Sequence, residues 1–94
     1  MLESTVETAL VERIKALGGD TRKVKWLCRN GAPDRLVMLP FSLKGPAKTI
    51  FVELKAPKKG PRRRQANEHE SLRALGQTVL VINTIELVDK HFPL

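Results

Sequence analysis

With 94 residues, of which 41% are hydrophobic and 29% charged, the chain has the size and balance of one globular domain spanning residues 1–94. Lys and Arg total 17 against 10 acids, and the net charge of +7 favours nucleic acid as a partner over a membrane surface. The sequence lacks an apolar run that could cross a bilayer and the start of a signal peptide. The single cysteine, Cys28, cannot form an intramolecular disulfide. We therefore expect a cytoplasmic protein.

Hydrophobic periodicity and turn residues predict the element order α-β-β-β-α-β-α. The first helix has Ser4 as its N-cap and ends at Gly18, and the last is capped by Asn83 or Thr84. The predicted elements are a helix over residues 5–17, strands over 24–28, 35–39 and 49–55, a helix over 64–75, a strand over 78–82 and a helix reaching about 91. Turns join them at 29–33, 40–48 and 57–61. Three strands followed by a helical crossover to a fourth indicate an α/β fold, a central mixed four-stranded sheet flanked by helices.

The strand over residues 49–55 (TIFVELK) combines an apolar run with a carboxylate and an ammonium group. Because side chains alternate along a strand, Glu53 and Lys55 share one face. Upstream, Asp34 follows a turn and precedes the strand over residues 35–39. If the two strands pair as a hairpin, Asp34 and Glu53 can converge. Two carboxylates at one point suit Mg²⁺, and a lysine beside them can orient an attacking water.

The adjacent pair Pro33-Asp34 followed by Glu53-Leu54-Lys55 resembles the PD…(D/E)xK signature of the restriction-endonuclease-like nucleases. Residues 31–35 (GAPDR), residues 51–57 (FVELKAP) and Gln65 opening the next helix resemble, more narrowly, the virus-type replication-repair nuclease (VRR-NUC) domain. The resemblance runs from about residue 3 to residue 82, nearly the whole chain. It implies a restriction-endonuclease-like fold and a metal-dependent endonuclease that hydrolyses DNA phosphodiester bonds.

The resemblance also implies a role for each site residue. Asp34, Glu53 and the main-chain carbonyl of Leu54 would ligate Mg²⁺ or Mn²⁺, and Lys55 would position the nucleophilic water.

Two helices would complete the site implied by the resemblance. Gln65 would help to organise it. Glu7 on the first helix, with Glu3 as the second choice, would hold a water or a second metal ion.

Each of these residues also has a purely structural interpretation. Glu53 and Lys55 could form an edge-strand ion pair, and Asp34 could be a turn residue after proline. Glu7 fits a capping box with Ser4, and for Glu7 both interpretations stay open. Taken together, the motifs favour a catalytic site. Three further residues receive no catalytic role: His69 and His91 lack a partner pattern, and Trp26 is expected in the core.

A basic stretch leaves the presumed catalytic strand. Residues 55–64 (KAPKKGPRRR) contain no acid and hold 6 of the 17 cations. A solvated charged run is one interpretation, but beside a phosphodiesterase site contacts to DNA phosphates are the better expectation. The expected DNA-binding residues are Lys58, Lys59, Arg62, Arg63, Arg64, Arg29 and Arg35.

The expected substrate is branched or structured DNA, because a chain this short lacks a separate domain for reading base sequence. Resemblance to Holliday junction resolvases, which need two symmetric cuts, further implies a homodimer. The setting would be a bacterial or phage-infected host cell. The alternative is a non-catalytic basic DNA-binding module.

Overall fold

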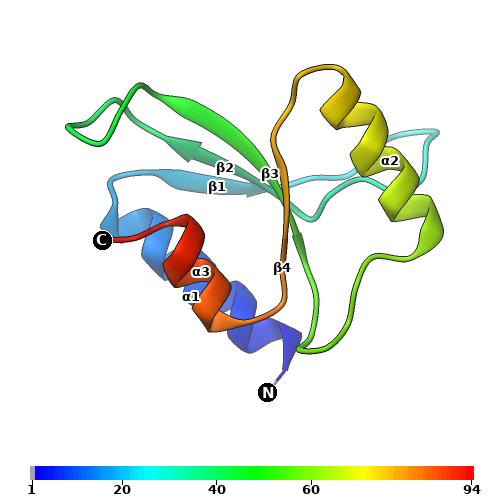
Figure 1. The fold of residues 1–94 in the computed structure, drawn as a ribbon, viewed down its shortest axis with the longest axis horizontal. Helices are drawn as coiled ribbons and strands as arrows, with labels where there is room; N and C mark the ends of the chain where they lie inside the picture. The colour runs from blue at the N-terminus through cyan, green and yellow to red at the C-terminus, as the bar shows by residue number, and fades with distance from the viewer. Residues whose placement is uncertain (1) are drawn as a thin grey trace.

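The computed structural model describes residues 2–94 as a four-stranded sheet with three helices (Figure 1). The elements are α1 (Glu3–Ala16), β1 (Asp20–Lys23), β2 (Arg35–Leu39), β3 (Lys48–Leu54), α2 (Arg63–Ala74), β4 (Val79–Ile82) and α3 (Ile85–His91). The strands lie in the order β1-β2-β3-β4, antiparallel up to β3 and parallel between β3 and β4. The predicted mixed α/β sheet and the predicted element order are confirmed.

The first predicted strand is wrong in position. β1 ends at Lys23, where the ladder with β2 stops at the pair Lys23–Arg35. Past this pair, one more backbone hydrogen bond joins the two segments, from the Val24 N–H to the Asp34 carbonyl at 3.0 Å. The apolar residues of 24–28 suggested a strand because their pattern is strand-like, but they form part of a loop.

The helix ends follow the predictions only in part. Leu2, rather than Ser4, is the N-cap of α1 and makes no side-chain cap, so the predicted capping box does not form. Gly18 follows the end of α1 with a φ of 84°, as a helix stop should. At the last helix Thr84 is the cap, and its hydroxyl accepts from the Leu87 N–H at 3.2 Å.

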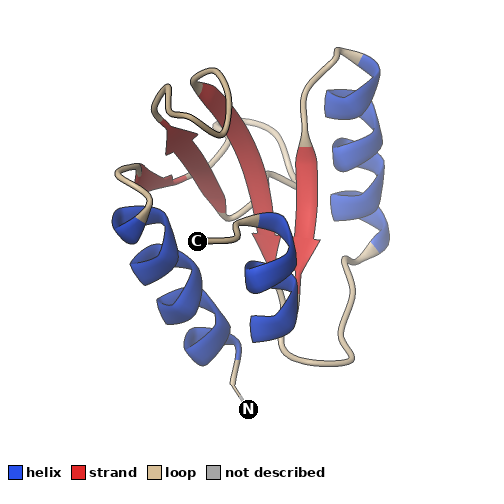
Figure 2. Ribbon diagram, turned by 60° about the vertical axis from the view of Figure 1, so that its left-hand side comes forward, coloured by secondary structure: helices blue, strands red, loops and turns tan. Residues whose placement is uncertain are grey.

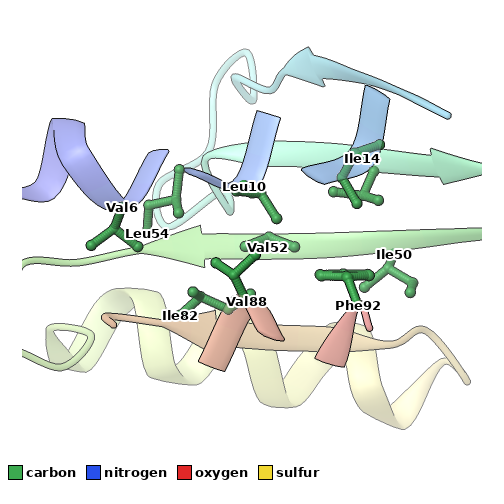
Figure 3. Close-up of a cluster of buried hydrophobic side chains, with 10 residues drawn as sticks. Val6, Leu10, Ile14, Ile50, Val52, Leu54, Ile82, Val88 and Phe92 are labelled. Atoms are coloured by element: carbon green, nitrogen blue, oxygen red, sulfur yellow. The ribbon is translucent and has the colours of Figure 1, made fainter. Parts of the chain in front are cut away.

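One face of the sheet carries the main hydrophobic core, under α1 and α3 (Figure 2). The apolar stripe of α1, Val6, Leu10 and Ile14, is buried. Figure 3 shows it packed with side chains from β3, β4, α3 and the residue after α3, namely Ile50, Val52, Leu54, Ile82, Val88 and Phe92. Each such burial stabilises the fold by about 1.5–3 kcal/mol. This rigid layer fixes β3, the strand that ends in Glu53 and Leu54.

The other face of the sheet meets α2 and is more polar. Glu53, Glu68 and His69 are all buried on this side. Trp26, expected in the core, is instead half-buried beneath α2, with its ring edge-on to Phe51 at a centroid distance of 6.1 Å. The polar half of the protein is therefore the half that could hold a reaction site.

No helix within residues 2–94 has the length and apolar character needed to span a membrane.

Gly19, between α1 and β1, provides a test of this packing. A Cβ added there would collide with the Met38 carbonyl oxygen and lie 3.0 Å from Ile14 Cγ2. We expect Gly19→Ala to lower the free energy of unfolding by about 1–3 kcal/mol, the usual cost of overpacking. Urea denaturation measures this. Gly60→Ala is the matched control, because a Cβ there meets no described atom within 4 Å. Equal stabilities of the two variants would contradict the close approach of α1 to β2.

Candidate active site

Strand pairing brings the two predicted acidic residues together. β2 and β3 pair with Arg35 opposite Val52, so one further step of the register sets Asp34 opposite Glu53. Directly opposed residues of an antiparallel pair point to the same side of the sheet. The hairpin expected from the sequence therefore does place both carboxylates at the same end of the sheet.

Asp34 is held by the backbone that precedes and faces it. Its Oδ2 accepts a hydrogen bond from the Leu54 N–H at 2.7 Å. Pro33, immediately before it, is fully buried and fixes the backbone at that point. The carboxylate is thus oriented before any ligand arrives.

Glu53 is only 1% exposed, and both of its oxygens have partners. Oε2 accepts from Gln65 Nε2 at 3.2 Å and lies 3.5 Å from the Lys55 ammonium. Oε1 lies 3.3 Å from His69 Nε2. When Glu53 is ionised its oxygens only accept, so His69 Nε2 then donates the proton in that pair. Three side chains therefore fix the plane of this carboxylate.

The electrostatics of Glu53 are those of a buried acid beside a second acid. Burial, followed by the negative charge of Asp34, raises the pKa of Glu53 from 4.5 to about 7, although Lys55 opposes the rise. A cation between the two carboxylates would remove the repulsion that contributes to this shift. The site accordingly has the charge distribution that favours a bound positive ion.

These donors fit a hard divalent cation with few protein ligands. Asp34 and Glu53 offer carboxylate oxygens, and Leu54 offers a main-chain carbonyl next to Glu53 in sequence. Within residues 2–94, no group of three or more His, Cys, Asp and Glu side chains is arranged to hold a metal ion. Mg²⁺ does not need such a cage, because it keeps several waters and uses one or two carboxylates.

A polar cleft of about 320 Å³ opens beside Asp34. It is lined by Glu3, Ser4, Glu7, Lys23, Val24, Asp34 and Leu54. Both first-helix glutamates considered from the sequence thus line the same cleft as Asp34, whereas the buried Glu53 is not among its lining residues. Glu7 is engaged by Arg35, whose Nε and Nη2 lie 3.2 Å from its carboxylate. This ion pair holds Glu7 toward the sheet.

The helix α2 supplies the remaining contacts to Glu53. Gln65 uses both ends of its amide: Oε1 accepts from the Arg62 N–H at 2.9 Å, and Nε2 reaches Glu53. His69 follows four residues later on the same helix face and is 1% exposed. Burial lowers the pKa of His69, which favours the neutral ring. Sequence reasoning missed His69, although its spacing from Gln65 was the signal that could have found it.

The predicted DNA-binding cations differ in their surroundings. Arg35 is bonded to Glu7 and to Thr21 Oγ1, and Arg29 is paired with Glu68 at 2.7 Å. The others are exposed, and among residues 2–94 none of their side chains forms an ion pair with an acid. These are Lys58, Lys59, Arg62, Arg63 and Arg64, which we call the basic arm. The Asn83 amide holds its backbone at the Lys59 carbonyl, 2.9 Å away.

Fold and site together define a nuclease domain of the restriction-endonuclease-like, PD-(D/E)XK class. No family model matches the chain. A protein of Acyrthosiphon pisum secondary endosymbiont phage 1, named as a candidate nuclease, p44, is 41% identical over 85 residues, 90% of this chain and 86% of that protein. A solved structure of a VRR-NUC domain superposes with a TM-score of 0.80 at 40% identity, covering 94% of this chain and 90% of that one. The chain belongs to the VRR-NUC domain family.

The raised pKa of Glu53 predicts a pH dependence of stability in metal-free buffer. A folded-state pKa of about 7 against an ordinary 4.5 gives stability that is fully present below about pH 4.5 and lost as the pH rises through 7. The difference in unfolding free energy, wild type minus Glu53→Gln, should therefore fall by roughly 2–3 kcal/mol over that window. Chemical denaturation at a series of pH values measures it. Glu86→Gln, an exposed site, controls for loss of one carboxylate. A difference that does not change with pH would contradict the buried acidic pair.

Proposed function

We propose that this VRR-NUC domain is a metal-dependent endonuclease that hydrolyses phosphodiester bonds in DNA. The observation that carries the proposal is the convergence of Asp34 and Glu53 at one end of the sheet, with Lys55 next to Glu53. A divalent cation bound there, Mg²⁺ or Mn²⁺, would supply Lewis-acid chemistry at the scissile phosphate. Asp34, Glu53 and the Leu54 carbonyl are the groups that would hold it.

Lys55 has the position and charge to act on the attacking water. It is half-buried, and Glu53 restrains its ammonium group at 3.5 Å. A fixed ammonium group can orient a water and stabilise the negative charge that develops on the phosphate. Gln65 and His69 keep Glu53 in place while this happens, because each contacts one of its oxygens. Glu7, across the cleft from Asp34, would hold a further water or ion.

The basic arm supports DNA as the substrate. Three arginines stand at the start of α2, and its first turn contains no acid. Positive charge at a helix N-terminus is unfavourable, by about 0.3–1 kcal/mol per residue. A phosphate bound at this position would offset that cost. The arm leaves the end of β3 directly, so phosphates that it grips would flank the scissile bond.

The proposed substrate is branched DNA, with the four-way junction as the main example. Residues 2–94 form one small core with one basic arm, and such a domain is suited to recognising the shape of the DNA backbone. Paired, symmetric cuts in such a junction require two active sites related by a two-fold axis, and hence a homodimer. This part of the proposal rests on symmetry and on the family resemblance.

Cleavage of labelled linear, flap and four-way-junction DNA, with Mg²⁺ or Mn²⁺ and with chelator, tests the activity directly. We expect metal-dependent cleavage by the wild type, with paired cuts in the junction, and its loss in Asp34→Asn. DNA affinity of Asp34→Asn should stay within about twofold, because the change removes a metal ligand and no phosphate-contacting cation. Asp20→Asn is the control for loss of an exposed carboxylate. Binding without cleavage by the wild type would instead favour the non-catalytic DNA-binding module.

Neutralising Arg62, Arg63 and Arg64 together tests the basic arm. Removing one cation that neutralises a DNA phosphate should lower the slope of log affinity against log salt by about 0.9 for duplex DNA. Binding should weaken similarly for every DNA structure, while turnover at saturating DNA stays nearly unchanged. The control is a triple variant in which Lys15, Lys48 and Lys90 are replaced by glutamine. These exposed residues lie near the end of α1, at the start of β3 and near the end of α3, whereas the site lies at the end of β3. Equal salt slopes for the two triple variants would place the DNA path elsewhere.

A further inference from the structure

The segment between β1 and β2, residues 24–34, ends in Asp34 and has no regular secondary structure. Cys28 within it has a φ of 59°, a left-handed conformation that is costly for residues other than glycine. A loop in such a conformation keeps one shape only where its surroundings impose it. Whatever fixes this loop also fixes the carboxylate at its end.

Glu68 of α2 lies beneath this loop and is bonded to two of its side chains. Its carboxylate accepts from Trp26 Nε1 at 2.6 Å and from Arg29 Nε and Nη2 at 2.9 and 2.7 Å. Glu68 is 7% exposed. The Arg29 guanidinium, helped by the Trp26 indole, holds the pKa of Glu68 below its usual value. Charge-assisted hydrogen bonds of this kind are among the strongest that a loop can make.

The loop backbone itself also lies against α2. Gly31 has a φ of 90°, and a Cβ there would come within 2.7 Å of the Arg64 carbonyl oxygen and 3.0 Å of Glu68 Cβ. Only glycine permits that approach in that conformation. The contact brings the loop onto the same turn of α2 from which Gln65 reaches Glu53.

We propose that Glu68 is a positioning residue that sets Asp34 relative to Glu53. Residues 65, 68 and 69 are spaced to share one face of α2. Gln65 and His69 hold Glu53, and Glu68 holds the loop that carries Asp34. One helix face therefore positions both carboxylates, although Glu68 contacts neither. The positioning of Asp34 by Glu68 does not depend on the proposed nuclease function. Only the expected effect of Glu68 on cleavage rests on that function.

Amide hydrogen exchange measured by NMR tests the link without any cleavage assay. The Leu54 N–H donates to Asp34 Oδ2, whereas the next amide, Lys55 N–H, donates to the Ile82 carbonyl. In Glu68→Gln, exchange at Leu54 should accelerate on the order of tenfold, the effect of weakening one charge-assisted hydrogen bond, while Lys55 is unchanged. Emission from Trp26, the only tryptophan, should shift to the red. The control is Glu70→Gln, on the same helix, which removes the same charge from a residue paired with Arg73.

The cleavage assay then tests the consequence for function. In Glu68→Gln, kcat at saturating DNA and metal should fall about tenfold or more, with DNA affinity within about twofold of wild type. Glu70→Gln should match the wild type. If Glu68→Gln does not fold, Arg29→Gln removes the opposite partner and should give the same exchange at Leu54.

Two results would overturn the proposal. Unchanged exchange at Leu54 would mean that Asp34 is held without Glu68, and faster exchange with an unchanged kcat would mean that this contact does not serve the reaction. Absence of cleavage by the wild type would refute the proposed nuclease function, and exchange at Leu54 would still decide whether Glu68 positions Asp34.

Discussion

The placement of Glu53, a buried carboxylate beside a second carboxylate, is the constraint on which the polar half of this structure depends. Burial and the charge of Asp34 both disfavour ionisation of Glu53, and its pKa rises to about 7. Such an arrangement costs stability unless something holds it together. Lys55, Gln65 and His69 do so by contacting its two oxygens. Without a cation, the acidic pair of Asp34 and Glu53 is unfavourable for folding. The same pair favours the binding of a cation.

The two faces of the sheet divide stability and chemistry between them. Under α1 and α3 the side chains are apolar and fix β3 in place (Figure 3). Toward α2 polar side chains meet one another in pairs, the buried Glu53 with the buried His69 and the buried Glu68 with the exposed Arg29. A strand between a rigid apolar layer and a polar layer can present a carboxylate with little freedom to move. Preorganisation of this kind is what a site for phosphoryl chemistry needs.

Much of this arrangement could be predicted from the sequence, for identifiable reasons. The alternation along TIFVELK and the turn before Asp34 are local signals, and the element order and the hairpin follow from them. The position of β1 was wrong, because residues 24–28 have a strand-like pattern but use Trp26 to contact α2. Glu68 was missed because its partners, Trp26 and Arg29, lie 42 and 39 residues away in the chain. His69 was missed because its contact with Glu53 spans 16 residues, and the only local clue to it was its four-residue spacing from Gln65. Contacts over such distances depend on tertiary packing, which a local pattern does not contain.

The central claim is that Asp34 and Glu53 form one cation site. A crystal structure of the protein soaked in Mn²⁺, with the ion located by its anomalous scattering, tests it most directly. We expect an anomalous peak between the carboxylates of Asp34 and Glu53 and beside the Leu54 carbonyl, with the remaining positions filled by water. The peak should be absent in Glu53→Gln. Manganese bound elsewhere, with no peak at these two carboxylates, would contradict the account.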